Sequence, residues 1–177
     1  MVTNPIYIAG GRWLAQIGST AAVVPECEVK WAKYDWCRPD LLSVEFAKGL
    51  IRIVEIKESR GDYTGEIRNR KWEKYLLLAD YFYFLVPCGL VKLNEVPDIA
   101  GLLYLEQNLY GDFEVKSIKR ARRINEEERR KVREQFDHKW PHSNRDIKII
   151  YEAMLRSYHN KYWYNSYAPL KAEMEKP

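Results

Sequence analysis

The fold is decided by one stretch of sequence, Leu50-Ile51-Arg52-Ile53-Val54-Glu55-Ile56-Lys57, which reads as a core strand that ends in charged residues. Glu and Lys are rarely buried in such a strand without a partner. Because side chains alternate along a strand, Glu55 and Lys57 point to the same face of the sheet. Asp40, after Pro39, is expected to bring a second carboxylate to this place from a neighbouring strand.

These side chains suit a magnesium-dependent nuclease. Mg²⁺ prefers about six oxygen ligands and keeps several of them as water. Asp40 and Glu55 are candidates for two of the protein ligands, and the backbone carbonyl of Ile56 for a third. Lys57 is then placed to orient the attacking water or to offset negative charge on the phosphate. A metal-bound water has a lowered pKa, so this chemistry needs no dedicated histidine base.

The pattern around this stretch predicts an α/β domain, with three antiparallel strands in a meander followed by a crossover helix and a parallel strand. A tight turn is expected at Lys48-Gly49, and a second turn over 108–112. The expected elements are, in order, a helix over 11–21, strands over 23–33, 41–46 and 50–57, a helix over 66–79, and strands over 81–86, 100–105 and 113–118.

Beyond 118 the sequence becomes basic and then aromatic. Asn125 is a plausible N-cap, and acidic residues fill the next turn, so a helix is expected there. A last helix is expected over 146–158. We therefore divide the chain into a core over 1–119 and a basic, aromatic helical extension over 120–177, packed on or beside that core.

Composition limits the class of protein. The 177 residues are 46% hydrophobic and 31% charged, as in a globular protein, and no apolar run reaches the roughly 20 residues that span a membrane. Three cysteines without metal-ligand spacing argue against a zinc site or a disulfide framework. We expect an intracellular, cytoplasmic protein with no membrane partner and no small-molecule organic cofactor.

The signature Pro39-Asp40 and Glu55-Ile56-Lys57 resembles that of the PD-(D/E)XK nuclease superfamily. The later segments Asp62-Tyr63, Arg70-Lys71-Trp72 with Tyr75, and 80–84 look like the MmcB-like DNA repair branch, over roughly 24–103. This resemblance implies a restriction-endonuclease-like α-β-β-β-α-β core with a mixed sheet and a C-terminal helical extension. It also implies hydrolysis of phosphodiester bonds in DNA with Mg²⁺ or Mn²⁺.

One feature departs from the pattern of that family. Many relatives carry a further acidic residue on the first helix, whereas 11–21 contains none and offers only Gln16. Glu26 or Glu28 on the following strand is a possible replacement, with Glu26 preferred as a metal ligand. If neither serves, the metal site has two carboxylates.

Candidate DNA contacts lie on the helix that flanks the site and in the basic stretch 116–133, which holds nine Lys or Arg against three Glu. Such an excess of positive charge favours binding to phosphates. For Tyr75 and Trp72 a core position is the alternative, and for Lys71 a solvated position. The candidate DNA-binding residues are Lys71, Tyr75, Arg120, Arg122, Arg123 and Arg130.

Three functions remain open at this stage. The first is a metal-dependent DNA nuclease, with Asp40, Glu55 and Lys57 as catalytic residues, acting in repair, recombination or phage DNA processing. The second is a catalytically inactive DNA-binding or scaffold protein that retains the nuclease fold. The third is a protein–protein module whose aromatic C-terminus forms an oligomer interface, and a homodimer is compatible with each.

Overall fold

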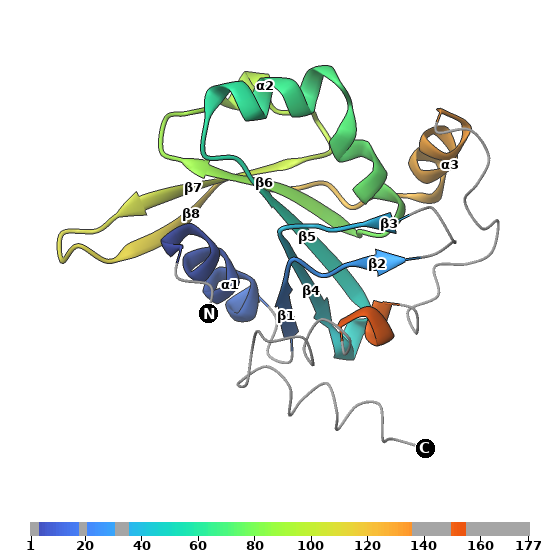
Figure 1. Ribbon diagram of the computed structural model, residues 1–177, viewed down its shortest axis with the longest axis horizontal. Coiled ribbons are helices and arrows are strands. Elements are labelled where there is room, and N and C mark those ends of the chain that lie inside the picture. The colour runs from blue at the N-terminus through green and yellow to red at the C-terminus, as the bar shows by residue number, and fades with distance from the viewer. Residues whose placement is uncertain (1–3, 18–20, 31–35, 136–149, 155–177) are drawn as a thin grey trace.

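The computed structural model describes residues 4–17, 21–30, 36–135 and 150–154 (Figure 1). Its centre is a six-stranded mixed sheet in the order β1-β4-β5-β6-β7-β8, and a two-stranded ribbon, β2-β3, lies beside it. The strands are β1 (Ala21–Pro25), β2 (Val29–Lys30), β3 (Trp36–Cys37), β4 (Leu41–Glu45), β5 (Leu50–Ile56), β6 (Tyr81–Pro87), β7 (Gly101–Gln107) and β8 (Phe113–Lys119).

The direction of the strands divides the sheet in two. β1 pairs antiparallel with β4, and β4 pairs antiparallel with β5, as the sequence predicts. β6 then pairs parallel to β5, and β7 parallel to β6. β8 returns antiparallel to β7. The crossover between β5 and β6 contains α2 (Arg60–Arg68) and the 3₁₀ helix η2 (Lys71–Leu77).

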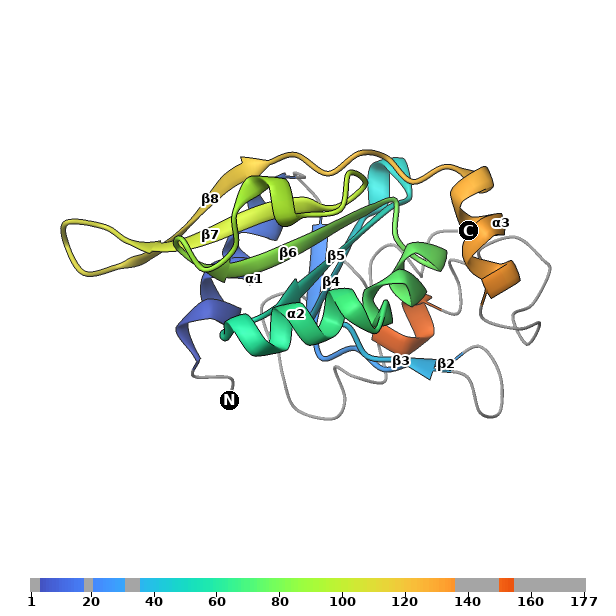
Figure 2. The same ribbon diagram turned by 90° about the horizontal axis from the view of Figure 1, so that it is seen from above.

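The sheet is covered on both faces. Helix α1 (Pro5–Ile17) packs on one face, and α2 with η2 covers the other (Figures 1 and 2). Strand β6 contributes to both hydrophobic clusters, with Phe82 and Phe84 on the α2 face and Leu85 on the α1 face. The expected doubly buried strand is therefore confirmed, as a strand flanked on both edges and covered on both faces must be apolar throughout.

Helix α1 begins earlier than the sequence pattern suggested. It starts at Pro5, where Asn4 Oδ1 accepts a hydrogen bond from the Ile6 amide at 3.1 Å, and it ends at Ile17 rather than near Ala21. Two glycines inside the helix weakened its helical pattern in the sequence. Gly10 has a packing reason, because a Cβ there would lie 2.7 Å from Leu41 Cδ1. The expected helix over 11–21 is wrong in both boundaries.

The expected strand over 23–33 is also corrected. β1 ends at Pro25, and Glu26 adopts a positive φ of 46°, which turns the chain out of the strand. In the sequence, the short ribbon β2-β3 lies between β1 and β4, which are neighbours in the large sheet. The meander is thus present, but only the link between β4 and β5 is tight. That link contains the 3₁₀ turn η1 (Phe46–Lys48) and Gly49 in the left-handed conformation.

The expected helix over 66–79 is in fact two helices. α2 starts at Arg60 because Ser59 caps it, its Oγ accepting from the Asp62 amide at 3.1 Å. Arg70 then adopts a positive φ of 53°, and η2 follows directly. The apolar period over this region is therefore shared between an α-helix and a 3₁₀ helix.

The strands β7 and β8 lie close to their expected positions and are joined by a turn over 108–112. Asn108 organises this turn, since its Oδ1 accepts from the amides of Tyr110 and Asp112 at 2.9 and 3.0 Å. Leu109 and Tyr110 are nonetheless exposed. The hairpin projects beyond the rest of the sheet (Figure 1).

Helix α3 (Glu126–Gln135) is capped as predicted. Asn125 Oδ1 accepts from the Glu128 amide at 2.9 Å, and the Glu128 carboxylate accepts from the Asn125 amide at 2.9 Å. The buried Arg129 attaches the helix to the core: it donates to the Ala79 carbonyl at 2.8 Å and lies 3.6 Å from the Asp80 carboxylate. Asp80 in turn accepts from the Ile51 amide at 2.7 Å, at the start of β5.

Residues 150–154 are helical and fall inside the helix predicted over 146–158. The remainder of that helix and the aromatic tail lie outside the described residues. Among the residues that the structure describes, no helix is both long and apolar enough to cross a bilayer.

Candidate functional site

The candidate site lies where β5 ends and β4 begins. The register of these antiparallel strands pairs Leu41 with Val54, so Asp40 reaches the end of β5. One oxygen of Asp40, Oδ2, accepts from the Ile56 amide at 2.7 Å. The other, Oδ1, accepts from the hydroxyl of Tyr7 on α1 at 3.0 Å. Asp40 is therefore held by two donors, one from the sheet and one from the helix beneath it.

Lys57 connects two further carboxylates. Its Nζ lies 3.1 Å from Glu55 Oε1 and 3.2 Å from Glu66 Oε2, and Glu66 comes from α2. The Lys57 amide donates to the Leu85 carbonyl of β6 at 3.0 Å, which fixes its backbone across the parallel strand pair. Two of the three ammonium protons thus have carboxylate partners, and the third is available to another acceptor.

Glu55 is the most constrained of these groups. Only 6% of the residue is exposed, and its Oε2 is buried with no hydrogen-bond partner among the described residues. Burial raises the pKa of Glu55 to about 8, the charge of Asp40 adds to the rise, and Lys57 opposes it. A buried carboxylate oxygen with no donor is costly for the fold, so this oxygen calls for a cationic or proton-donating partner.

The charged form of Lys57 is favoured by its neighbours. Burial lowers the pKa of this ammonium, but the charges and hydrogen bonds of Glu55 and Glu66 outweigh burial and raise it above its ordinary value. Lys57 is therefore a cation in this site and not a proton acceptor.

Two phenols border the carboxylates. Burial, followed by the charge of Asp40, raises the pKa of Tyr7. Burial, followed by the charge of Glu55, raises the pKa of Tyr75, whose hydroxyl donates to the Arg38 carbonyl at 3.4 Å. Both hydroxyls consequently keep their protons: that of Tyr7 donates to Asp40, and that of Tyr75 donates to the Arg38 carbonyl.

Neither acid that was considered as a replacement for the first-helix carboxylate is part of this buried cluster. Glu26 is exposed; its amide donates to the Asp40 carbonyl at 2.9 Å, so its backbone adjoins the site. Glu28 is exposed and pairs with Lys30 at 3.1 Å. Helix α1 has no acidic residue and presents Tyr7 to Asp40 instead.

The cluster can accept a metal ion in chemical terms, although it is not a three-acid site. Within the described ranges, no group of three His, Cys, Asp or Glu side chains is placed to hold one. Asp40 and Glu55 nevertheless supply hard oxygens, and a carboxylate that accepts one hydrogen bond at each oxygen retains lone pairs. The unpartnered Oε2 of Glu55 is the specific observation that fits a divalent cation.

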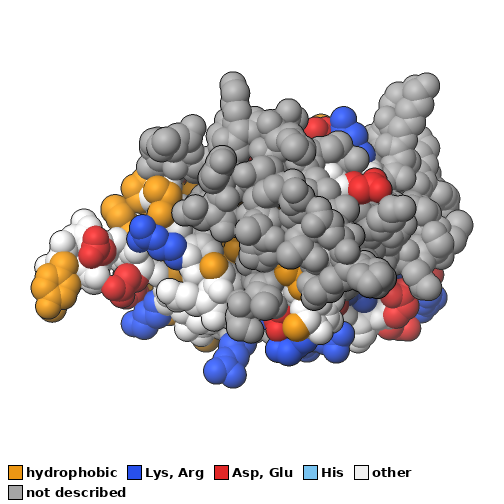
Figure 3. All heavy atoms as spheres, turned by 90° about the horizontal axis from the view of Figure 1, so that it is seen from below, with side chains coloured by type: hydrophobic (Ala, Val, Ile, Leu, Met, Phe, Trp, Pro, Cys, Tyr) orange, Lys and Arg blue, Asp and Glu red, His pale blue; other side chains and the backbone are white. Residues whose placement is uncertain are grey.

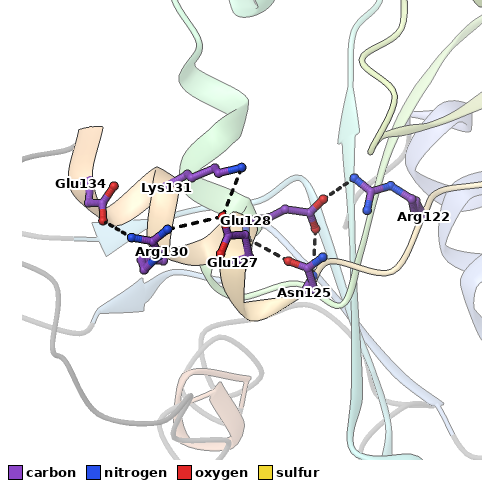
Figure 4. A network of polar contacts seen from close by, with 7 residues as sticks. All are labelled: Arg122, Asn125, Glu127, Glu128, Arg130, Lys131 and Glu134. Carbon is purple, nitrogen blue, oxygen red and sulfur yellow. Dashed lines mark hydrogen bonds and ion pairs between the residues drawn. The ribbon is translucent and has the colours of Figure 1, made fainter.

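The predicted DNA-binding residues differ in accessibility. Lys71 is exposed, whereas Tyr75 is buried and its ring stacks on Phe82 at 5.9 Å between centroids. Arg122 pairs with Glu128, and Arg130 pairs with Glu127 and Glu134 (Figure 4). Arg120 and Arg123 are exposed.

Sequence reasoning missed Tyr7 and Glu66. Tyr7 lies outside the helix that was expected, so its position on a sheet-facing turn was not apparent. Glu66 follows the buried Tyr63 by three residues in α2, and that spacing places it on the side of the helix nearest the sheet. Had the helix been assigned from Arg60, its spacing would have indicated Glu66.

Comparisons with known proteins bear on the fold alone. No family model matches the sequence, and no curated protein matches it. Among solved structures, the chain is similar to the SPO1766 protein of unknown function from Silicibacter pomeroyi, with 21% identity and a TM-score of 0.51. The match covers 77% of this chain and 86% of that one. It shows a shared mixed α/β fold.

Proposed function

We propose that this chain is a metal-dependent DNA nuclease of the PD-(D/E)XK class, related to the MmcB-like DNA repair proteins. The observation that carries the proposal is the buried, unpartnered Oε2 of Glu55, beside Asp40 and on the same sheet face as Lys57. The antiparallel β1-β4-β5 meander, followed by a helical crossover to the parallel strand β6, supports a restriction-endonuclease-like core.

Asp40 and Glu55 are the residues that would hold Mg²⁺ or Mn²⁺. Such an ion supplies a water of lowered pKa and a positive charge beside the phosphate. Tyr7 and the Ile56 amide hold the Asp40 carboxylate in one orientation, so this side chain is already ordered when a ligand binds.

Lys57 acts on the phosphate. Its ammonium is held between Glu55 and Glu66, and its remaining proton can bond to a phosphate oxygen or to the attacking water. A fixed cation at this place offsets the negative charge that develops during phosphodiester hydrolysis. Because its neighbours keep it protonated, Lys57 serves this role as a charge and a hydrogen-bond donor.

The alternative is an inactive DNA-binding protein with the same fold. One observation favours it: α1 presents a phenol rather than a carboxylate to Asp40. The cluster therefore has fewer acids than a site for two metal ions requires. This alternative predicts binding to DNA in EDTA and no cleavage with either Mg²⁺ or Mn²⁺.

The test is a cleavage panel of single-stranded, duplex and branched DNA, incubated with Mg²⁺, Mn²⁺ or EDTA. We expect metal-dependent cleavage by the native chain and none by Glu55→Gln or Lys57→Ala. Circular dichroism and DNA binding in EDTA should be nearly unchanged in both variants.

Glu58→Gln is the matched control, because Glu58 is exposed, follows Lys57 directly and bonds only to Asn4 among the described side chains. It should cleave as the native chain does. Unchanged cleavage by Glu55→Gln or Lys57→Ala would contradict the nuclease proposal, and an inactive native chain that still binds DNA would support the alternative.

A further inference from the structure

The cations of α3 are largely neutralised by acids of the same segment. Arg130 lies between Glu127 and Glu134, Lys131 lies 3.4 Å from Glu127, and Arg133 lies 2.6 Å from Glu126 (Figure 4). Arg129 is buried against Asp80. A phosphate that approached these residues would have to compete with the carboxylates that already pair with them, so the basic appearance of α3 overstates its affinity for nucleic acid.

Three cations beside the candidate site are in the opposite situation. Arg38, Lys71 and Lys74 form no ion pair with any described residue. Arg38 and Lys71 are exposed, and Lys74 is half-buried with its Nζ 5.0 Å from the centre of the Tyr75 ring. Each is therefore free to release counterions when it meets a phosphate.

Contacts around Tyr75 place these cations near the carboxylates. The Tyr75 hydroxyl donates to the Arg38 carbonyl, two residues before Asp40. After burial, the charge of Glu55 is the next cause of the raised pKa of this hydroxyl, so Glu55 lies near it. Burial raises the pKa of the Cys37 thiol, and the nearby charge of Lys74 opposes this rise; Cys37 directly precedes Arg38. Lys71 lies one turn before Lys74 in η2, and residues three apart in a 3₁₀ helix lie above one another.

The site also needs such cations. The three acidic residues Asp40, Glu55 and Glu66 outnumber Lys57, so without a metal ion the buried cluster does not attract a phosphate. Favourable binding must come from positive charge around the rim of the cluster. Arg38 lies between β3 and β4, and the two lysines belong to η2, whose Tyr75 borders Glu55 and donates to the Arg38 carbonyl.

We propose that Arg38, Lys71 and Lys74 form the main contact with the phosphate backbone of DNA, and that α3 contributes little to it. This inference rests on the proposed nuclease function for its choice of DNA as the ligand. The projecting β7–β8 hairpin is a poor phosphate contact, because its end carries Leu109 and Tyr110 beside the acidic Asp112 and Glu114. Figure 3 shows hydrophobic and acidic side chains gathered at that end.

The experiment measures binding without cleavage. The full chain carrying Glu55→Gln is titrated with a fluorescent duplex of about 20 base pairs in EDTA, at salt concentrations from about 50 to 200 mM, a range over which three phosphate contacts change the affinity by about 40-fold. Arg38→Gln, Lys71→Gln and Lys74→Gln are introduced singly and together. Arg130→Gln with Lys131→Gln is the control, and it removes two positive charges from α3, against three in the triple variant.

We expect each rim substitution to lower the slope of log affinity against log salt by about 0.9, and the triple variant by about 2 to 3. The α3 control should change the slope by less than about 0.5. Glutamine keeps part of the side-chain stem, and thermal unfolding verifies that each variant is folded.

The outcomes separate this inference from the nuclease proposal. A slope that falls in the α3 control and not in the triple variant overturns the inference, as does a native chain that binds no DNA at 50 mM salt. Normal salt-dependent binding through the rim without any cleavage leaves the inference standing and removes the nuclease proposal.

Discussion

At the scale of single residues, the Tyr7–Asp40 hydrogen bond is the contact that ties α1 to the candidate site. The acceptor is an ionisable carboxylate and the donor is partly buried, and hydrogen bonds to charged groups contribute more than neutral ones, about 1.5–3 kcal/mol. The loss of this donor also frees Asp40 to reorient.

We therefore predict that Tyr7→Phe lowers the free energy of unfolding by about 1.5–3 kcal/mol and changes the affinity for Mn²⁺. Urea unfolding measures the first effect and isothermal titration calorimetry the second. Tyr63→Phe is the control, because it removes a hydroxyl that donates to the Glu95 carbonyl, away from the acidic cluster. An unchanged Mn²⁺ affinity in Tyr7→Phe would show that Tyr7 does not position Asp40 for a metal.

Asp40, Glu55 and Lys57 were predictable because strand alternation and one tight turn determine their relative positions. The 50–57 strand, the 41–46 strand and the turn at Lys48-Gly49 are local features, and they lie within a residue or so of their predicted places. Tyr7 and Glu66 reach the same cluster only through packing of helices on opposite faces. Sequence spacing along one strand contains no information about such contacts.

At the scale of elements, the packing of α1 on the sheet depends on Gly10. A Cβ there would meet Leu41 Cδ1 at 2.7 Å and Leu85 Cδ2 at 2.8 Å, closer than side chains normally approach. The glycine lowers intrinsic helix stability and in return lets the helix lie close to β4 and β6. That exchange explains why the helix was hard to recognise from its sequence.

We predict that Gly10→Ala lowers the free energy of unfolding by about 1–3 kcal/mol, since overpacking forces α1 or both leucines to shift. Gly65→Ala is the control: Gly65 lies inside α2 with nothing within 4 Å of the added Cβ. There the better helix propensity of alanine should stabilise the fold by about 0.5–1 kcal/mol. Urea unfolding measures the change in the free energy of unfolding, which should be negative for Gly10→Ala and positive for Gly65→Ala. Equal changes in the two variants would contradict the close approach at Gly10.

The β4–β5 hairpin contains a pH-sensitive ion cluster. The Lys48 hydrogen bond, together with Arg52, lowers the pKa of the buried Glu45 against the opposing effect of burial. Because the folded pKa is below the unfolded one, the stabilisation is present above the ordinary carboxyl pKa. It is lost as the pH falls through the folded value.

We predict that the native chain loses more stability than Glu45→Gln between pH 6 and pH 3. Urea unfolding across this range gives the two curves. Glu28→Gln, which removes an exposed carboxylate paired with Lys30, should follow the native curve. Parallel curves for the native chain and Glu45→Gln would show that the hairpin cluster does not contribute.

At the scale of the whole molecule, the candidate site joins four parts of the chain: α1, the start of β4, the end of β5, and α2. Any ligand that binds the cluster in the folded state and not in the unfolded chain stabilises the complete fold by mass action.

We predict that Mn²⁺ or Mg²⁺ at about 100 times its dissociation constant stabilises the native chain by about 2.7 kcal/mol, a rise in Tm of roughly 5–10 °C for a chain of this size. Thermal unfolding with metal or EDTA measures the shift. Glu55→Gln should show little of it and Glu58→Gln all of it. An equal shift in Glu55→Gln would place the metal elsewhere.

The meander and the crossover to a parallel strand followed from the sequence, since such connections leave few arrangements. The breaks in the chain did not. Glu26 and Arg70 adopt positive φ although neither is glycine, so the residue types at these positions did not indicate that β1 or α2 would end there.

The contact between Arg129 and Asp80 affects how the polypeptide can be divided. Asp80 directly precedes β6, accepts a hydrogen bond from the Ile51 amide of β5 and is 4% exposed. The guanidinium that lies 3.6 Å from its carboxylate belongs to a residue almost fifty positions later. A shortened gene product that stopped after Lys119 would retain every strand of the large sheet, yet it would keep a buried anion without its guanidinium. The removal of one partner from a buried ion pair costs about 3–5 kcal/mol, a large share of the stability of a small protein. Expression of a minimal six-stranded fragment is therefore expected to fail, and any useful fragment must extend through α3.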